Sequence, residues 1–330
     1  MRILFWGSPE FAVASLRALD DEGFEIVGVV TQPDRPAGRG RRLKPSAVKA
    51  VALEQGFVVH TPERPRTDEF LEAIRALEPD ISVVVAYGHI LKPEVLEIPR
   101  LGSINVHASL LPQLRGAAPI NWALVRDHVE TGVTVMRMVE AMDAGAIIHQ
   151  VHEPIFPDET ATELTIRLSE LGAEALIEAL VLVGAGQAEE TEQNHQEATY
   201  APKVDRETAR IDWSGSNREV AAHVRGMDAV PGAWSQLSGS PVKLFRPSLV
   251  SAAEVDLIEL HDPVTNGGPP VADTVAQPGL VLRTLPDEGV LVLTGEGGVS
   301  FAEVQPPGKR RMSAVDWING RGVEPGQRFE

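Results

Sequence analysis

Three polar residues, Asn105, His107 and Asp143, have the types and spacing to perform chemistry together. Asn105 and His107 end a short run of β-forming residues, and a loop rich in Ser, Pro and Gly follows at once. Because side chains alternate faces along a strand, the two point the same way, with attachment points roughly 6 to 7 Å apart. An amide and an imidazole at this spacing could hold one small carbonyl between them.

These residue types suit acyl transfer to an amine. That reaction needs a donor for the oxyanion and a group that manages the proton lost by the amine. Asn105 keeps its donor at neutral pH, and His107 can exchange a proton or, when protonated, help to bind the oxyanion. Asp143, which we expect in a turn between two strands, would favour the imidazolium and orient the ring.

Each residue alone also has a purely structural explanation. An Asn at a strand end often forms a turn, a single His is commonly a hydrogen-bonded structural residue, and Asp before Gly is a frequent turn. Together, at the carboxyl ends of strands in an open α/β sheet, they favour function. His149 and His152 are three positions apart in a predicted strand and point to opposite faces, so we expect no metal site.

The first half of the chain must position these residues. Residues 1 to about 185 alternate short apolar runs with amphipathic segments, a pattern typical of βαβ units around a parallel sheet. We therefore predict an α/β catalytic domain over residues 1–186, with a Rossmann-like, mostly parallel sheet. The first strand-to-helix loop is not a GxGxxG motif, so the usual dinucleotide phosphate cradle is missing.

A change of composition divides the chain after this domain. Residues 187–207 are polar and Glu-rich without periodicity, and we interpret them as a linker. Residues 208–330 carry short β-forming runs at 242–249, 279–285, 290–294 and 299–304, separated by Gly and Pro clusters. This pattern predicts a small β-barrel domain, related in architecture to the OB-fold.

Charge and composition restrict the partners and the compartment. The 330 residues carry a formal net charge of -17, which argues against general attraction to nucleic acid. No apolar run approaches the ~20 residues of a membrane span, and the first residues read as a strand rather than a signal peptide. With no cysteine in the chain, we expect a cytoplasmic protein without disulfides or thiolate chemistry.

Two local basic segments are exceptions to the acidic balance. They are either solvated surface loops or sites of local nucleic-acid contact, and composition alone leaves both readings open. The first segment comprises Arg35, Arg39, Arg41, Arg42 and Lys44, and the second comprises Lys309, Arg310 and Arg311.

A longer pattern around the polar residues resembles a known family. The run Asn105-x-His107-x-Ser109-Leu110-Leu111-Pro112 with Arg115-Gly116, followed by Asp143-x-Gly145, resembles the catalytic signature of the folate-dependent formyltransferases. Members that act on different amines share this core, so it indicates the chemistry and not the acceptor. The segments 5–12, 31–40, 115–120, 209–213 and 306–314 resemble the members that act on charged initiator tRNA.

The resemblance implies a fold and a reaction. It implies a Rossmann-like catalytic domain, a linker and an OB-like C-terminal domain. It also implies transfer of the formyl group of 10-formyltetrahydrofolate to the α-amine of methionine on initiator methionyl-tRNA. We expect a monomer that needs no metal. Two alternatives stay open, namely a formyltransferase acting on a sugar-nucleotide amine and a catalytically silent RNA-binding relative.

Roles for individual residues follow from the same resemblance. Asn105 and His107 would polarise the formyl carbonyl, and Asp143 would manage the charge of His107 and the leaving proton. Reduced folate would be bound by Ser109, Leu110, Leu111 and Pro112. The tRNA would be bound by Arg35, Arg39, Arg41, Arg42, Lys44, Lys309, Arg310 and Arg311.

Overall fold

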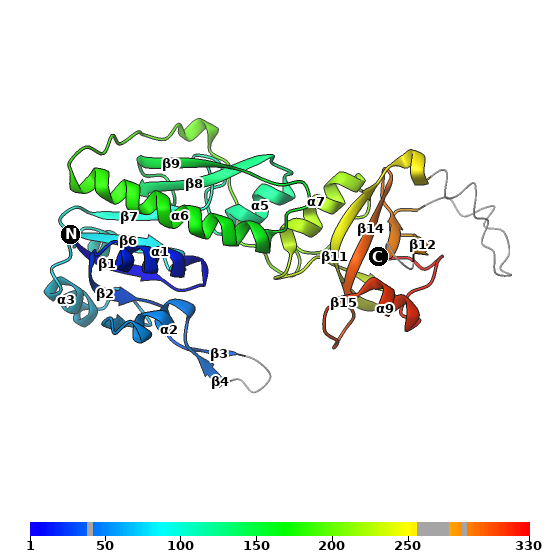
Figure 1. Ribbon diagram of the computed structural model, residues 1–330, viewed down its shortest axis with the longest axis horizontal. Helices are drawn as coiled ribbons and strands as arrows, with labels where there is room; N and C mark the ends of the chain where they lie inside the picture. Colours follow the sequence, from blue (N-terminus) through cyan, green and yellow to red (C-terminus); the bar gives the residue numbers. More distant parts are fainter. Residues whose placement is uncertain (38–41, 256–276, 286–288) are drawn as a thin grey trace. The chain divides into compact units, whose positions relative to one another are not determined.

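Two compact units make up the computed structural model, which describes residues 1–37, 42–255, 277–285 and 289–330 (Figure 1). The first unit comprises residues 1–119, 130–154 and 163–202. The second comprises residues 120–129, 155–162 and 203–330. Two short pieces from the first half of the chain thus belong to the second unit.

The first unit is built on a seven-stranded sheet in the order β5-β2-β1-β6-β7-β8-β9. Neighbouring strands from β5 to β7 are parallel, and β8 and β9 continue the sheet antiparallel. Every residue of β6 is buried, as expected for a parallel strand covered on both faces. This confirms the predicted Rossmann-like, mostly parallel sheet. The strands are β1 (Arg2–Gly7), β2 (Glu25–Val30), β5 (Val59–His60), β6 (Ile81–Val85), β7 (Ser103–His107), β8 (Glu130–Arg137) and β9 (Ile147–Pro154).

Helices connect these strands, and local sequence signals explain several of their limits. Ser46 accepts a hydrogen bond from the backbone N–H of Lys49 and thereby caps α2. Pro93 opens α4, a position where its missing N–H costs nothing. The helices are α1 (Phe11–Asp21), α2 (Ala47–Glu54), α3 (Asp68–Ala76), α4 (Pro93–Leu96), α5 (Pro119–Val125) and α6 (Ala161–Gly184).

Two smaller features of the first unit bear on function. A short antiparallel hairpin, β3 (Arg35–Ala37) with β4 (Arg42–Lys44), follows β2. Residues 187–202, which contain the 3-10 helix η1 (His195–Glu197), lie along the first unit. Thr191 exchanges both backbone hydrogen bonds with Ile147, and Arg115 does the same with Thr199 and Ala201. This segment is therefore hydrogen-bonded to the first unit at both ends.

The second unit is an antiparallel sheet in the order β10-β11-β14-β13-β12, with β15 beside β14. Backbone hydrogen bonds join the C-terminal residues to both edge strands, at Gln236 in β10 and at Val281 in β12, so the sheet is curled and nearly closed. The predicted barrel-like second domain is confirmed. Its elements are α7 (Asn217–Met227), β10 (Trp234–Leu237), β11 (Ser240–Val250), β12 (Val281–Leu285), β13 (Gly289–Leu293), β14 (Gly298–Gln305), β15 (Met312–Ser313) and α9 (Ala314–Asn319).

Each unit has its own hydrophobic core. In the first, Trp6, Phe70 and Ile74 pack with Val84 of β6. In the second, Trp213 and Phe301 pack edge to face at the centre of the barrel. Within the described ranges of the chain, no helix is both long enough and apolar enough to cross a membrane.

Candidate active site

Strand β7 carries Asn105 and His107 to the carboxyl edge of the sheet in the first unit. Asn105 lies opposite Val84 of β6, and His107 lies opposite Thr134 of β8. Because the two are separated by one residue, their side chains leave the same face of the strand. His107 is 6% exposed and Asn105 is half-buried. A polar pair therefore occupies the edge where ligands bind in open α/β sheets.

The two nitrogens of the His107 ring have different surroundings. Nε2 lies 3.0 Å from the backbone carbonyl oxygen of Leu114. A carbonyl can only accept, so Nε2 carries a proton and donates it. Nδ1 faces Asp143, with 3.8 Å between Nδ1 and Oδ2. This distance is too long for a hydrogen bond and short enough for an ion pair when the ring is charged.

Asp143 lies in the turn between β8 and β9, with its backbone in the left-handed region at φ 51°. Its Oδ2 accepts a hydrogen bond of 2.8 Å from the backbone N–H of Gly116. Only glycine fits at position 116, because φ is 122° and a Cβ would lie 2.6 Å from the carbonyl oxygen of Ala201. The Arg115-Gly116 motif thus supplies a donor that holds the Asp143 carboxylate beside His107.

Asn105 differs from its neighbours because its amide is not engaged. Among the residues that the structure describes, no side chain or backbone group forms a hydrogen bond with that amide, and the amide is not fully buried. Its two N–H groups are thus available to a ligand. The structure brings Asn105, His107 and Asp143 together at one edge of the sheet.

Tyr87, which follows β6, is a further titratable group at this edge. Its side chain is 2% exposed, and burial raises the pKa of the phenol to about 12. The phenol therefore stays neutral over the physiological pH range and cannot serve as a base there. Its backbone carbonyl accepts hydrogen bonds from Gln32 and Ser8, which joins the loops after β1, β2 and β6.

The loop 109–112 follows the catalytic strand and is held from within. Ser109 is fully buried and donates to the carbonyl of Gln113, and the Leu111-Pro112 peptide bond is cis. Leu111 is 3% exposed, whereas Leu110 and Pro112 are half-buried. Of the four residues predicted to bind folate, Leu110 and Pro112 are the better placed to touch a ligand.

Thr134 and Gln150 support this loop, a role that no sequence pattern indicated. Thr134 Oγ1 donates to the carbonyl of Ser109 and accepts from the backbone N–H of Leu111. Gln150 Nε2 donates to Thr134 Oγ1 and to the carbonyl of Leu111. Both lie on the antiparallel strands β8 and β9, so only their register with β7 reveals the connection.

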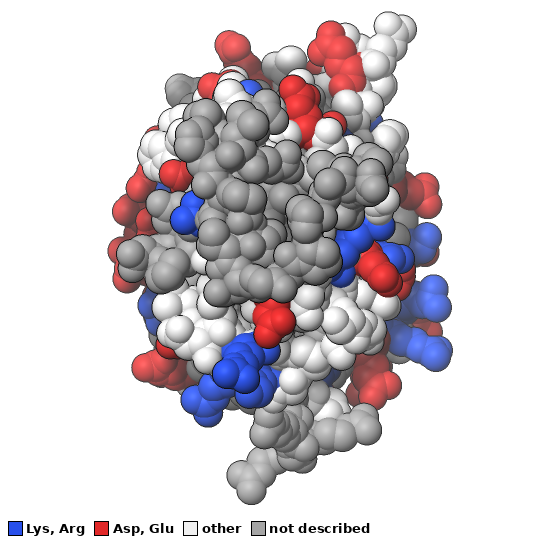
Figure 2. Space-filling model, turned by 90° about the vertical axis from the view of Figure 1, so that its right-hand side faces the viewer, with Lys and Arg blue, Asp and Glu red and all other residues white. Residues whose placement is uncertain are grey.

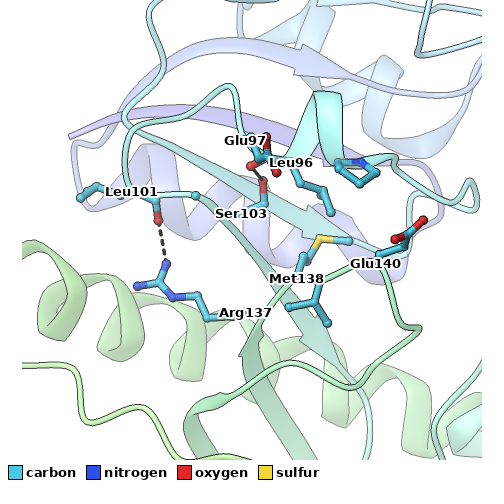
Figure 3. Close-up of a pocket in the computed structure, with 10 residues that line it drawn as sticks. Leu96, Glu97, Leu101, Ser103, Arg137, Met138 and Glu140 are labelled. Atoms are coloured by element: carbon cyan, nitrogen blue, oxygen red, sulfur yellow. Dashed lines mark hydrogen bonds between the residues drawn. The ribbon is translucent and has the colours of Figure 1, made fainter.

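A cavity of about 500 Å³ opens near the start of β7 (Figure 3). Figure 3 shows Ser103 donating to the carbonyl of Leu96, and Arg137 reaching the carbonyl of Leu101. Ser103 shares a strand face with Asn105 and His107 by alternation. The cavity therefore lies along the same row of side chains. Its lining, which the sequence did not predict, comprises Pro93, Leu96, Glu97, Leu101, Gly102, Ser103, Arg137, Met138, Val139 and Glu140.

The first basic segment includes both strands of the β3–β4 hairpin. Arg35 and Lys44 are paired across the hairpin, and both are exposed. Arg39 and Arg41 lie outside the described residues, and Arg42 is described by its backbone only. At the base of the hairpin, Lys49 and Asp34 form an ion pair of 2.7 Å.

The second basic segment divides into two parts. Lys309 and Arg310 are exposed in the turn between β14 and β15. Arg311 is 30% exposed and lies 2.9 Å from the buried carboxylate of Asp228, beside Glu303 and 4.0 Å above the ring of Phe245. Arg311 is thus part of the packing of the second unit. On the face drawn in Figure 2, blue Lys and Arg side chains form small groups among red carboxylates.

Comparison with known proteins gives a consistent result over the whole chain. Residues 1–180 match the sequence profile of the formyl transferase family, and residues 203–322 match that of the formyl transferase C-terminal domain. The methionyl-tRNA formyltransferase of Symbiobacterium thermophilum is 44% identical over 100% of this chain and 95% of its own length. That of Bacillus subtilis is 40% identical over 98% of this chain and 96% of its own.

A solved structure supports the fold. HypX from Aquifex aeolicus in complex with tetrahydrofolic acid matches with a TM-score of 0.61 and 21% sequence identity. The match covers 96% of this chain and 47% of HypX. At this identity the likeness concerns the fold alone.

Proposed function

The chain belongs to the family of methionyl-tRNA formyltransferases, and we propose that it transfers the formyl group of 10-formyltetrahydrofolate to the α-amino group of methionine on initiator methionyl-tRNA. The observation that carries this proposal is the unengaged amide of Asn105 beside the His107–Asp143 pair. Formylation of this tRNA belongs to translation initiation, so we place the protein in the cytoplasm. The methionyl-tRNA formyltransferase relatives favour this function over the sugar-nucleotide alternative, and the intact Asn105, His107 and Asp143 disfavour the silent RNA-binding alternative.

In the proposed mechanism the methionine amine attacks the formyl carbon, and Asn105 donates to the oxygen that becomes negative. An uncharged amide whose N–H groups have no other partner in the described structure can give both of them to this oxygen as the charge develops. The new C–N bond gives a tetrahedral intermediate. Collapse of that intermediate breaks the bond between the formyl carbon and N10 of the folate.

His107 transfers the proton that this exchange requires. Because Nε2 is committed to the Leu114 carbonyl, Nδ1 is the atom that can take a proton from the attacking amine. The Asp143 carboxylate, 3.8 Å away, stabilises the imidazolium that results. Nδ1 then returns the proton to N10 of the leaving tetrahydrofolate, and the ring is neutral again.

For the folate donor we propose the cavity near Ser103 and the surface of the loop 109–112. The cavity offers the apolar side chains of Leu96, Met138 and Val139, with polar groups at its rim, a combination suited to a flat heterocycle. Leu110 and Pro112 would contact the donor, while Ser109 and Leu111 hold the loop in shape.

For the tRNA we propose the two basic segments. Arg35, Arg39, Arg41, Arg42 and Lys44 would contact phosphates near the acceptor end, and Lys309 and Arg310 would contact phosphates elsewhere. We assign Arg311 a supporting role, because its guanidinium is already paired with Asp228 and Glu303. Residues 1–186, 187–207 and 208–330 remain our proposed domain limits.

The test is a formylation assay with 10-formyltetrahydrofolate and charged initiator tRNA. We expect formyl-methionyl-tRNA as the product, and we expect Asn105→Ala, His107→Ala and Asp143→Ala to lower turnover far more than tRNA binding. Absence of product at high enzyme concentration would contradict the proposed function. Variants that lose tRNA binding and keep turnover would contradict the assigned roles.

A further inference from the structure

Within residues 189–197 of the predicted linker, Gln193 is buried and every other residue is exposed. Its side chain is 5% exposed, while the neighbouring Glu192 and Asn194 are exposed. A buried amide is stable only when its donors and acceptors are satisfied, because an unpaired buried polar group costs about 1 to 3 kcal/mol. The partners of Gln193 therefore show what holds it in place.

Those partners come from the two loops that build the site. Gln193 Nε2 donates to the carbonyl oxygens of Asp143 and Gly145, at 3.0 and 2.8 Å. Gln193 Oε1 accepts from Nε and Nη2 of Arg115, at 3.1 and 2.5 Å. Both hydrogens and both lone pairs of the amide are thus used. One side chain joins the turn of Asp143 to the loop of Arg115.

The turn that Gln193 holds needs such support. The left-handed backbone of Asp143 costs on the order of 1 to 3 kcal/mol and persists only when its surroundings enforce it. Gly145 is packed so closely that a Cβ would lie 2.0 Å from the carbonyl oxygen of Arg137. Donation from Gln193 to the carbonyls at 143 and 145 satisfies the polar groups of this crowded turn.

The other end of Gln193 orders the donor to the Asp143 carboxylate. Arg115 is 5% exposed, and no carboxylate lies within ion-pair distance of it in the part of the chain that the structure describes. Its guanidinium donates instead to Gln193 and to Nδ1 of His195. The next residue, Gly116, supplies the N–H that binds Asp143 Oδ2. Gln193 is thus hydrogen-bonded both to the turn that carries Asp143 and to the residue next to Gly116.

We propose that Gln193 is a positioning residue for formyl transfer, acting through Asp143. It keeps the Asp143 carboxylate within ion-pair distance of His107 Nδ1 without touching either substrate. The inference rests on the proposed function, and it makes the predicted linker part of the catalytic machinery.

Three variants test this role. Gln193→Met keeps the size of the side chain and removes all four hydrogen bonds. Gln193→Glu keeps the acceptor for Arg115 and replaces the two donated bonds by repulsion from the carbonyls of Asp143 and Gly145. Gln196→Met, on an exposed residue of the same segment, is the matched control.

We expect kcat to fall about 100-fold in Gln193→Met and in Gln193→Glu, since a misplacement of 1 Å can cost this much. KM for both substrates should stay within about threefold of the wild-type value, because Gln193 contacts neither. Gln196→Met should behave as wild type. If Gln193→Met does not fold, Gln193→Glu still decides, because its carboxylate pairs with the Arg115 guanidinium. A folded Gln193→Glu with wild-type kcat would overturn the proposal.

A double-mutant cycle separates positioning from general structural support. In an Asp143→Ala background, Gln193→Glu should lower the residual kcat by less than about threefold, because the group through which it acts is gone. A further 100-fold loss would mean that Gln193 acts elsewhere, and the proposal would fail. These results are interpretable only if the wild-type protein formylates the tRNA, so an inactive wild type contradicts the proposed function instead.

Discussion

Single residues of the site differ in whether their side chains already form hydrogen bonds within the protein. His107 and Asp143 are engaged by Leu114 and Gly116, whereas the amide of Asn105 is unengaged in the described structure. An engaged group is oriented before substrate arrives, and an unengaged donor can be given entirely to the oxyanion. This difference predicts that Asn105 tolerates no replacement that removes its donor.

Asn105→Asp tests that donor with almost no change in shape. The carboxylate cannot donate and repels the developing oxyanion, so kcat/KM should fall about 1,000-fold, since loss of one such donor alone costs about 100- to 1,000-fold. Single-turnover formylation measures the effect on the chemical step. Asn319→Asp adds the same charge at an exposed helix end and should leave the rate unchanged. A loss below tenfold at position 105 would remove Asn105 from the mechanism.

Gly116→Ala tests whether the backbone donor to Asp143 requires glycine. The new Cβ meets the Ala201 carbonyl in a left-handed conformation, so the free energy of unfolding should fall by about 3 kcal/mol. Gly56→Ala is the control, because φ is also positive and no atom lies within 4 Å of the added Cβ. It should cost about 1 kcal/mol. Urea unfolding of both variants measures the difference, and equal losses would show that the close approach to Ala201 is unimportant.

The sequence predicted the residues whose chemistry is distinctive and missed those that act by register. Asn105, His107 and Asp143 were identified because strand alternation and a turn signal sufficed to place them. Gln193 and Thr134 are ordinary residue types, and neither lies in a motif. Their contacts depend on how the segment 187–202 and strand β8 lie against the rest of the unit, and no local pattern encodes that arrangement.

Elements of the second unit show the same limit. The longer β-forming runs predicted β11 to β14, but the two-residue β15 exists only because β14 offers it a partner. The near closure of the barrel depends on the C-terminal residues, which carry no strand signal and pair with both edges. The first unit gives another example, because the cavity beside β7 is formed jointly by α4 and the turn after β8.

At the turn between β14 and β15, adjacent arginines should have separable effects. Arg310→Ala removes an exposed charge, so it should weaken tRNA binding and lower the salt slope by about 1 without changing stability. Arg311→Ala leaves the buried Asp228 carboxylate without its cation. Because Arg311 is 30% exposed and solvent screens part of the pair, the loss in unfolding free energy should be about 2 kcal/mol. Filter binding and urea unfolding measure the two effects. The reverse pattern would show that Arg311 is the tRNA contact.

The whole molecule has a large excess of Asp and Glu over Lys and Arg, and its Lys and Arg side chains form small clusters. A net charge of -17 repels nucleic acid in general, so tRNA binding must depend on local cations and on shape. The sequence pI of about 5.0 also limits the pH range over which the protein stays well charged. Acid stability is therefore best examined above that value.

Three histidines should make folding stability fall as the pH drops below about 6.5. Burial is the main cause that lowers the pKa of His60, His128 and His223 from the ordinary value of 6.5. Below that pH these histidines are protonated in the unfolded chain more readily than in the folded chain. Their contribution to the free energy of unfolding is therefore fully present above pH 6.5 and is lost as the pH falls. Carboxyl groups with lowered pKa values, such as Asp212, act only at more acidic pH.

His223 should contribute most to this decline, since its ring is the most buried of the three. Urea unfolding at pH 7.5 and 5.5 measures the decline, to which one histidine can add at most about 1.4 kcal/mol per pH unit. His223→Asn removes the titrating group and should flatten the pH dependence. His89→Asn, on an exposed side chain, is the control for the substitution itself. An unaltered slope in His223→Asn would show that the acid sensitivity comes from other groups.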